Sequence, residues 1–230
     1  MAELPDLTII YLTANVIPEN FANATKGYLL EATHGYPLIS VSHKPMDFGQ
    51  NIIVDLPRSH ASIYRQLLIG AKQATTPYVA VAEDDVLYSP EHFKFRPKPK
   101  HWGYNMNSWN LYTWGEPLFN YKAPEGRKGL YGLICEREML IEHLEERFKL
   151  WPDDKDIRIE IFGEPGKYDN QLGTYPYPSQ PFYVNPPNIV FSHQSALGFQ
   201  GLGTRKALGQ IRANRIPYWG DAREIAKLYE

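Results

Sequence analysis

Cysteine occurs once in this chain of 230 residues, at position 135. A single thiol excludes an internal disulfide and any zinc site built from several cysteines, and it is typical of a protein of the reducing cytoplasm. No uninterrupted apolar run approaches the roughly 18–20 residues of a membrane helix. The first twenty residues carry Glu3, Asp6 and Glu19 where a secretory leader would carry basic residues. We therefore expect a cytoplasmic protein without a membrane span.

An excess of charge of either sign is also missing, because 24 Lys and Arg residues stand against 26 Asp and Glu residues, a formal net charge of -2. This balance argues against a general polyanion binder, although it is compatible with a local basic face. The chain is 43% hydrophobic and 22% charged, which disfavours disordered and fibrous classes. Its length suffices for a sizeable core. Without an internal repeat or an obvious linker, we expect a single domain.

Aromatic residues and proline are abundant, with 16 Tyr, 5 Trp and 19 Pro. Tyrosine and tryptophan suit surfaces that stack on sugars or bases, because each has a flat apolar face and a polar edge. An aromatic-rich core joined by rigid loops accounts for the same composition. Both interpretations stay open at this point.

Residues 1–90 alternate short apolar runs with amphipathic stretches, a pattern typical of a mostly parallel sheet covered by helices. Apolar spacing predicts a helix over residues 18–32. A second helix is expected to begin at a Ser59 or Ser62 cap and to stop before Pro77. Four strands are predicted, at residues 7–13, 37–42, 51–56 and 78–82.

Residues 91–230 differ in texture from the first part of the chain. Residues 92–119 lack clean periodicity and predict irregular loops with a small antiparallel extension. Residues 151–187 are rich in Pro, Gly and Asp and predict ordered but irregular structure. The other expected elements are a strand at 130–134, a helix at 137–150, a strand at 188–191 and a terminal helix at 222–229.

Three consecutive acids, Glu83, Asp84 and Asp85, follow the predicted strand at residues 78–82. Open α/β sheets bind ligands at the carboxyl ends of their strands. Adjacent carboxylates raise one another's pKa unless a cation neutralises them, and oxygen ligands favour Mg²⁺, Mn²⁺ or Ca²⁺ over zinc. The segment predicts a divalent cation site. The alternative is a solvated acidic turn in which Asp84 or Asp85 caps a helix near Pro90.

Three features together carry a family resemblance: a first strand that ends in Thr13-Ala14-Asn15, a helix that bears Tyr64-Arg65-Gln66, and an apolar strand that runs into Glu83-Asp84-Asp85. They resemble the nucleotide-sugar half of GT-A glycosyltransferases, particularly family 2-like members, over residues 7–90. A weaker similarity extends through residues 132–137, Asp169 and His193. The resemblance implies a Rossmann-like α/β fold of the GT-A type, with a mostly parallel sheet flanked by helices. Residues 1–90 would bind the nucleotide-sugar, and residues 91–230 would form an irregular, aromatic-rich acceptor half.

The acidic triplet corresponds to the Asp-x-Asp motif of that family. The resemblance implies that Glu83 lies near the ribose or base and that Asp85 is a ligand of Mn²⁺ or Mg²⁺, with Asp84 assisting directly or through water. Glutamate in the first position departs from the family pattern, which weakens the expected ribose contact. The residues expected to line the nucleoside pocket are Thr13, Ala14 and Asn15.

Two further residues enter through the resemblance. His193 follows a short apolar run late in the chain, where the family often places a histidine that completes the metal shell, and a neutral imidazole is an acceptable Mn²⁺ ligand. Arg65 is expected near the diphosphate or uracil, since a guanidinium matches phosphate oxygens in a bidentate way. The structural alternatives are a hydrogen-bonded histidine after a strand and a surface arginine on an exposed helix face.

A catalytic base is expected between the metal motif and the late histidine. Inverting transfer needs a carboxylate that removes the proton from the attacking acceptor hydroxyl. Asp169, at the start of a predicted helix, fits the place that the family gives this residue. Glu164 is its rival, and Asp153 or Asp154 are weaker ones; each of the first two is also compatible with a cap or a turn.

Two basic stretches complete the candidates. Residues 201–215 contain Arg205 and Lys206 in a Gly-rich setting without an acid, which suits a loop that closes over a diphosphate or a solvated tail. Residues 92–115 also lack an acid and interleave Lys and Arg with Trp and Tyr. That pattern suits stacking on a sugar acceptor, contacts with nucleic acid, or an aromatic mini-core shielded by long basic side chains.

The expected activity is a metal-dependent transfer of a sugar from a nucleotide-diphosphate donor, most simply a UDP-sugar, to an acceptor hydroxyl, with inversion if Asp169 is the base. The acceptor is a glycan, a hydroxyl-bearing small molecule or, as in some phage enzymes of this type, a hydroxymethylated base in DNA. A non-catalytic nucleic-acid-binding or glycan-binding protein is the main alternative. A sugar-1-phosphate nucleotidyltransferase ranks lower, because residues 14–18 lack the Gly-rich basic loop that such enzymes carry after the first strand.

Overall fold

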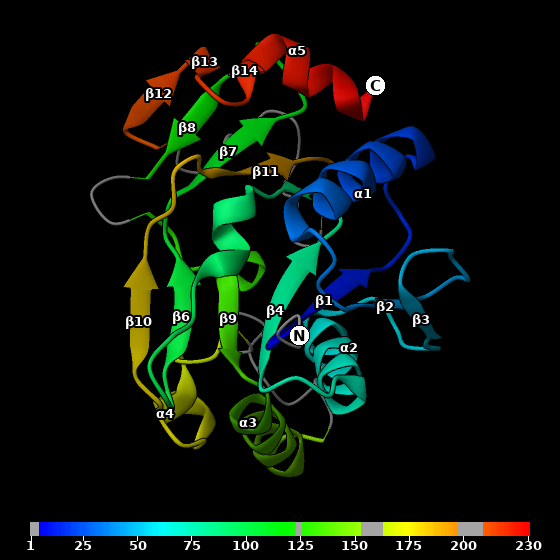
Figure 1. Cartoon of the computed structure of the whole chain (residues 1–230), viewed down its shortest axis with the longest axis vertical. Coiled ribbons are helices and arrows are strands. Elements are labelled where there is room, and N and C mark those ends of the chain that lie inside the picture. The colour runs from blue at the N-terminus through cyan, green and yellow to red at the C-terminus, as the bar shows by residue number, and fades with distance from the viewer. Residues whose placement is uncertain (1–4, 123–125, 153–162, 197–208) are drawn as a thin grey trace.

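The computed structural model describes residues 5–122, 126–152, 163–196 and 209–230. Within these ranges a seven-stranded sheet has the order β10-β6-β9-β4-β1-β2-β3, and a five-stranded sheet has the order β12-β8-β7-β11-β5. Figure 1 shows the smaller sheet lying across the end of the larger one to which β4 points. The expected class, an α/β fold with a mostly parallel sheet flanked by helices, is confirmed.

The amino-terminal half of the large sheet is parallel. Its strands are β1 (Leu7–Thr13), β2 (Leu38–Ser42), β3 (Gln50–Ile53) and β4 (Tyr78–Glu83). Every residue of β1 is buried, because parallel strands covered on both faces read as continuous apolar runs. The register pairs Thr13 with Ser42 and Leu12 with Glu83. The carboxyl ends of β1, β2 and β4 therefore reach the same edge of the sheet.

The other half of the large sheet was expected only in part, because a strand was predicted at residues 130–134 but none at residues 102–105 or 179–182. Strand β9 (Leu133–Glu136) runs antiparallel between β4 and β6 (Trp102–Asn105), and β10 (Ser179–Phe182) pairs with β6 in parallel. The expectation of irregular loops over residues 92–119 is thus wrong for β6. All four residues of β6 are buried, so this strand shows no alternation that periodicity would detect.

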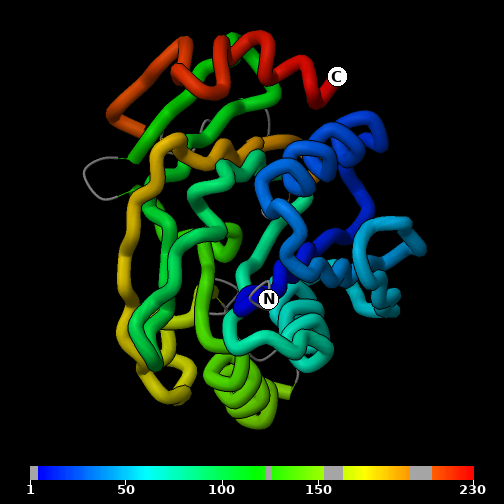
Figure 2. The backbone as a smooth tube through the Cα atoms, viewed as in Figure 1, coloured from blue at the N-terminus to red at the C-terminus, as the bar shows by residue number. Residues whose placement is uncertain are grey.

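The small sheet contains the antiparallel extension that was expected. Its strands are β5 (Val86–Leu87), β7 (Ser108–Tyr112), β8 (Phe119–Tyr121), β11 (Asn188–Ser192) and β12 (Ile211–Ala213). A two-stranded ribbon of β13 (Arg215–Ile216) and β14 (Gly220–Asp221) leads into α5 (Ala222–Ala226). The chain end lies beside α1, as the tube in Figure 2 shows.

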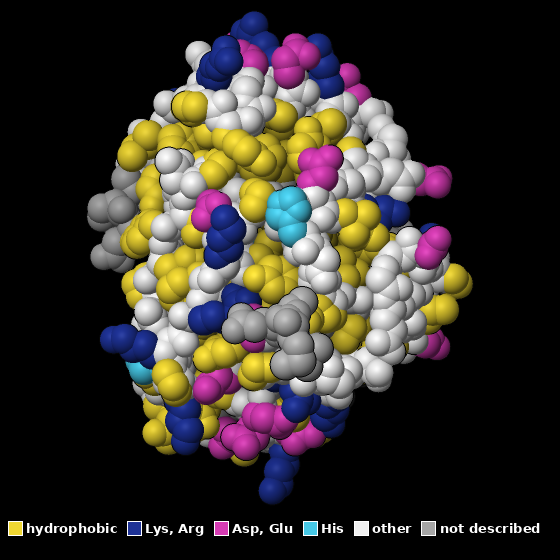
Figure 3. Space-filling model, viewed as in Figure 1, with side chains coloured by type: hydrophobic (Ala, Val, Ile, Leu, Met, Phe, Trp, Pro, Cys, Tyr) yellow, Lys and Arg dark blue, Asp and Glu magenta, His cyan; other side chains and the backbone are white. Residues whose placement is uncertain are grey.

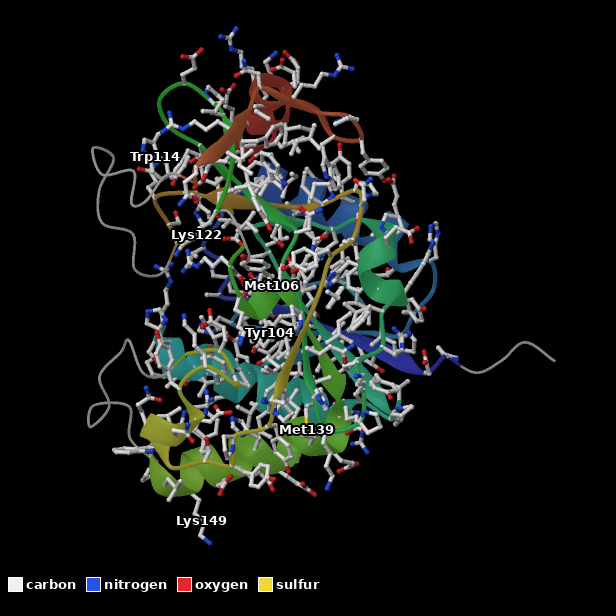
Figure 4. All side chains as sticks on the ribbon, turned by 90° about the vertical axis from the view of Figure 1, so that its left-hand side faces the viewer. Tyr104, Met106, Trp114, Lys122, Met139 and Lys149 are labelled. Carbon is white, nitrogen blue, oxygen red and sulfur yellow. The ribbon has the colours of Figure 1, made fainter. Side chains whose placement is uncertain are left out.

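Helices cover both faces of the large sheet. Helix α1 (Glu19–Thr33) packs Leu29 and Ala32 on the face that contains Ile9 and Tyr11. Helices α2 (His60–Gln73) and α3 (Arg137–Leu150) pack on the face that contains Ile10 and Leu12. Tyr104, Met106 and Met139 belong to this second cluster and lie inside the molecule in Figure 4. Alternate residues of β1 therefore pack into two separate hydrophobic cores, one on each face of the sheet.

The short elements refine the expected boundaries. Ser59 caps α2 by accepting a hydrogen bond from the Ser62 amide, at 3.2 Å. The strand expected at residues 130–134 begins with a 3₁₀ turn, η2 (Leu130–Gly132), before β9. The expected terminal helix is divided into α5 and a 3₁₀ turn, η4 (Lys227–Tyr229). Two other short elements are η1 (Pro90–Lys94) and α4 (Asp169–Leu172).

Within the described part of the chain, no helix combines the length and the apolar character needed to cross a bilayer.

A glycine in α2 sets how closely this helix approaches the sheet. A methyl group at Gly70 would come within 2.5 Å of Ile10 Cγ2, whereas one at Gly27 in α1 would meet nothing within 4 Å. We predict that Gly70→Ala lowers the free energy of unfolding, because overpacking costs about 1–3 kcal/mol, more than the gain of up to about 1 kcal/mol in helix propensity. Gly27→Ala, the matched control, should raise it. Urea denaturation measures both, and an increase for Gly70→Ala would contradict the packing described.

Candidate functional site

A cavity of about 230 Å³ opens at the carboxyl edge of the large sheet. Its walls come from the ends of β1 and β4, the first turns of α2, and the segment after β11. This is the edge at which open α/β sheets bind their ligands. Of the residues singled out in the sequence, the cavity brings together Thr13, Ala14, Glu83, Asp84, Asp85 and His193.

The three acids lie in a poorly solvated setting with little compensation. Burial and the two neighbouring carboxylates raise the pKa of Glu83 well above its usual value. Burial and Asp85 raise the pKa of Asp84 to about 7, although the Thr13 hydroxyl donates a 2.5 Å hydrogen bond to Asp84 Oδ2. Carboxylates held in this way disfavour their own ionisation. The cluster therefore has a net attraction for a cation.

His193 reaches the acids through strand pairing. Strand β5 follows directly after Asp85 and pairs antiparallel with β11, with Val86 opposite Val190. The Phe191 amide also donates to the Asp85 carbonyl, at 2.9 Å. As a result, His193 Nε2 lies 3.2 Å from Asp85 Oδ2, and the histidine side chain is only 3% exposed. Two residues 108 positions apart in the chain thus place their polar atoms together.

Asp85 and His193 alone supply too few donor atoms for Mn²⁺ or Mg²⁺. They fit either cation only if a bound substrate and water supply the remaining donors. Among the residues that the structure describes, no three His, Cys, Asp or Glu side chains are grouped to hold a metal ion. Asp85 and His193 supply one carboxylate oxygen and one imidazole nitrogen. Magnesium sites commonly use one or two carboxylates and take their other ligands from phosphates and water. The raised pKa of Asp84 is a separate observation that favours cation binding at this place.

The end of β1 is held by hydrogen bonds across the sheet. Asn15 has a left-handed backbone, with φ of 54°, and its Oδ1 accepts hydrogen bonds from the His43 and Lys44 amides, each at 2.9 Å. Thr13 and Ala14 line the cavity, whereas Asn15 fixes their loop from outside it. Thr13 and Ala14 therefore lie at the cavity, and Asn15 acts on it only through their loop. Contact of these residues with a nucleoside stays a prediction.

Several residues that line the cavity were missed in the sequence. Gln66 is 3% exposed and donates to the Thr13 and Val41 carbonyls, at 3.1 and 3.0 Å, which ties α2 to the strand ends. Arg58 donates to the Ser195 carbonyl and joins the loop before α2 to the segment after β11. Burial lowers the pKa of His60. Arg58 and His60 are the sequence neighbours of the Ser59 cap, so an arginine and a histidine flanking a helix start were the available signal.

Arg65 is not brought to this cavity. Its guanidinium lies 4.3 Å from the centre of the Phe148 ring of α3 and donates to the Pro152 carbonyl, at 2.7 Å. It is absent from the residues that line the cavity. The structure therefore gives Arg65 a packing contact between α2 and the end of α3, and no contact with the acids.

Asp169 lies away from the acids as well. It begins α4, as expected, but it is 3% exposed and lines a second pocket. Its Oδ2 accepts from the Gly166 amide at 2.8 Å, and its Oδ1 lies 3.6 Å from Arg147 Nη2 and 3.5 Å from His143 Nε2. Burial raises its pKa to about 6. The group is positioned mainly by contacts with α3 and with its own loop.

Glu164 connects the two pockets electrostatically. Its charge raises the pKa of Glu83 in the first cavity and acts on Lys128 in the second. Its side chain is 16% exposed and pairs with Lys167 at 3.3 Å. Of the two candidate bases, Glu164 is thus the one whose field reaches the acidic cluster. Asp153, Asp154, Arg205 and Lys206 lie outside the described residues.

The basic and aromatic stretch of residues 92–115 is largely used for packing. Trp102 and Tyr104 are fully buried and Tyr112 is 7% exposed. Lys94 pairs with Glu91, and Arg96 pairs with Asp6 at 2.6 Å. Side chains in these positions do not offer a row of free rings to a nucleic acid. The arrangement is that of the aromatic mini-core among the alternatives weighed from the sequence.

No family model and no curated protein sequence matches this chain. Solved structures do match. A glycosyltransferase involved in the glycosylation of the major capsid of PBCV-1 is 14% identical, with a TM-score of 0.46 over 81% of this chain and 92% of that one. TarS of S. aureus in complex with UDP-GlcNAc is 10% identical, with a TM-score of 0.43 over 84% and 60%. A nucleotidyl transferase from Methanothermobacter is 12% identical, with a TM-score of 0.40 over 60% and 75%. These similarities concern the fold, and the activity has to be argued from the site.

The acidic cluster predicts an unusual pH dependence of stability in EDTA. Folding raises the pKa of Asp84 from 3.8 to about 7, so the folded protein keeps a proton that the unfolded chain releases. The Asp84 contribution to stability is therefore largest near pH 4 and is lost as the pH rises to about 7. We predict that Asp84→Asn flattens this decline and raises the melting temperature at pH 8. Equal slopes for the variant and the wild type between pH 5 and 8 would contradict this assignment.

Proposed function

We propose that this protein transfers a sugar from a nucleotide-diphosphate donor, with UDP as the expected nucleotide, to an acceptor hydroxyl. The observation that carries the proposal is the pairing of Asp85 with His193 beside two acids of raised pKa, at the carboxyl edge of a parallel sheet. A cation held by this pair would neutralise the cluster and attract the diphosphate at once.

The residues of the cavity have distinct proposed roles. Asp85 and His193 would hold Mn²⁺ or Mg²⁺, which when bound stabilises the negative charge that develops on the leaving diphosphate. Thr13 orients Asp84 through its hydroxyl, and Gln66 holds the Thr13 carbonyl in place. Glu83 is proposed to face the ribose. We keep Arg205 and Lys206 as proposed phosphate contacts from the sequence.

The acceptor is expected on the side of Glu164 and Asp169. Transfer with inversion requires a carboxylate on the side of the sugar opposite the diphosphate. Asp169 remains the proposed base, since its raised pKa of about 6 suits proton transfer near neutral pH. Glu164 is the alternative, supported by its electrostatic link to Glu83. A hydroxymethylated base in DNA is the acceptor we favour least, because Trp102 and Tyr104 are buried.

The second candidate function is a non-catalytic glycan-binding or nucleic-acid-binding protein. It accounts for the aromatic composition without any cation. It predicts binding that ignores both nucleotide and metal, whereas the transferase predicts nucleotide binding that EDTA abolishes. A nucleotidyltransferase remains the weakest candidate, since the cavity wall after β1 is formed by Ala14, Val16 and Ile17 and lacks a basic glycine loop.

The proposed donor site predicts a metal-dependent thermal shift. UDP with Mn²⁺ should raise the melting temperature, because a ligand that binds only the folded state stabilises it by about 2.7 kcal/mol at a hundredfold excess over its Kd. Asp85→Ala should abolish this shift. Glu31→Ala, which removes an exposed carboxylate from α1, should leave it unchanged. If UDP, GDP and other nucleotides all fail to shift the wild-type protein with Mn²⁺ present, the proposal is wrong.

The two candidate bases make different predictions for stability and transfer. Asp169→Asn should lower the melting temperature, because it removes the carboxylate that lies 3.6 Å from the buried Arg147 guanidinium, whereas Glu164→Gln should not. The variant that lacks the base should still bind UDP with Mn²⁺ but lose transfer by about a hundredfold or more. Donor turnover in the presence of acceptor measures this. Unchanged turnover in both variants would exclude both residues.

A further inference from the structure

The second pocket, of about 350 Å³, is formed mainly by the loop before α4 and the segment leading into β10. Two of its lining residues, Lys128 and Lys167, are cationic. Burial and the neighbouring Lys167 lower the pKa of Lys128, whereas the charges of Asp169 and Glu164 act in the opposite direction. Among the described residues Lys128 has no hydrogen-bonded or ion-paired carboxylate, and its Nζ lies 5.7 Å from the centre of the Tyr104 ring. Lys167 pairs with Glu164 at 3.3 Å and lies over the Tyr168 ring. An anion between the two ammonium groups would lower their mutual repulsion.

One lining residue of the pocket, Ser179, carries a buried polar atom without a partner. Its Oγ has no hydrogen bond in the described part of the chain, and neither has Nε1 of the fully buried Trp102. Buried polar groups are rarely left in this state. Both side chains pack against Gly166, which has a left-handed φ of 79°, and a methyl group there would lie 2.6 Å from Ser179 Oγ. Glycine is required at this position because these side chains leave no room for a Cβ atom.

The rim of the pocket adds an aromatic face. The Tyr177 ring lines the pocket and lies 4.5 Å, centre to centre, from the Tyr175 ring, which is 61% exposed. An exposed ring beside a partly buried one, each with a polar edge, suits the apolar face of a sugar. A volume of about 350 Å³ is near the lower end for ligand pockets, which suits one sugar ring better than a polymer strand.

We propose that this pocket binds the acceptor and that the acceptor is a monosaccharide unit carrying an anionic group, phosphate or carboxylate. The sugar ring would lie on Tyr177, its anionic group between Lys128 and Lys167, and a polar atom against Ser179. The assignment as acceptor rests on the proposed transferase function. The charge of Glu164 acts on Lys128 in this pocket and on Glu83 in the acidic cavity. Glu164 therefore links the two sites electrostatically.

Calorimetric titration with four sugar and phosphate probes, and with a short single-stranded DNA, tests the proposal. Glucose 6-phosphate and glucuronate should bind, and their relative affinities distinguish phosphate from carboxylate. Glucose and inorganic phosphate should each bind at least about tenfold more weakly, since each lacks one part of the recognised ligand. Lys128→Met should weaken binding of the charged sugars about tenfold, the smallest effect expected for loss of a charge-assisted hydrogen bond. Ser179→Ala provides an independent second variant.

The matched control is Lys149→Met. Lys149 is at the end of α3, and Figure 4 shows its side chain pointing away from the body of the molecule. This variant should bind the probes as the wild type does. Melting curves of all three variants confirm that they are folded before affinities are compared.

Several outcomes would overturn the proposal. They are equal binding of glucose and glucose 6-phosphate, inorganic phosphate as strong a ligand as the sugar phosphate, or a short single-stranded DNA that binds more tightly than either. If UDP with Mn²⁺ stabilises the protein and no charged sugar binds, this inference fails while the donor site stands. If charged sugars bind and UDP does not, the pocket is a sugar site, but its assignment as an acceptor site is overturned.

Discussion

Repulsion among three carboxylates at the end of β4 is the constraint on which the site depends. The acids are held there by the sheet register and by short contacts such as that of Thr13 with Asp84, so they cannot relax into water. Burial and this repulsion raise the pKa values of Glu83 and Asp84. A fold keeps such an arrangement when the cost of crowding the charges is recovered on binding a cation. The small sheet brings His193 to the same cavity, which His43 and His60 also line.

The two sheets have different tasks in this arrangement. The large parallel sheet brings strand ends and a helix start to one edge, where Gln66 and Ser59 fix the first turns of α2. The small sheet continues directly from the acids through β5 and returns through β11. Because β5 has only two residues, movement of β11 would move His193 relative to Asp85. The relative position of Asp85 and His193 therefore depends on this short ladder.

Charge is also divided between two pockets. Glu83, Asp84 and Asp85 line the first cavity. Lys128 and Lys167 line the second, together with Asp169, whose buried carboxylate lies 3.6 Å from Arg147. Figure 3 shows that the face seen in Figure 1 is mixed, with apolar patches and scattered charges of both signs. The net charge of the chain is close to zero, but the two pockets differ in local charge: acids predominate in the first and lysines in the second. Such a difference in local charge suits the proposed transfer, in which a cation-bound diphosphate would occupy the first cavity and an anionic acceptor the second.

Local sequence determined the elements whose signals are short-range. The buried run of β1, a serine cap at position 59 or 62, and helix α3 over residues 137–150 were all predicted, because burial on both faces, capping and helical spacing depend on neighbouring residues. The acidic triplet was found for the same reason. Tertiary structure alone decided that β6 joins the large sheet, that Arg65 packs on α3, and that Asp169 lies in a different pocket from Asp85. These outcomes depend on which distant segments pair and which face of a helix is covered, and no local pattern encodes either.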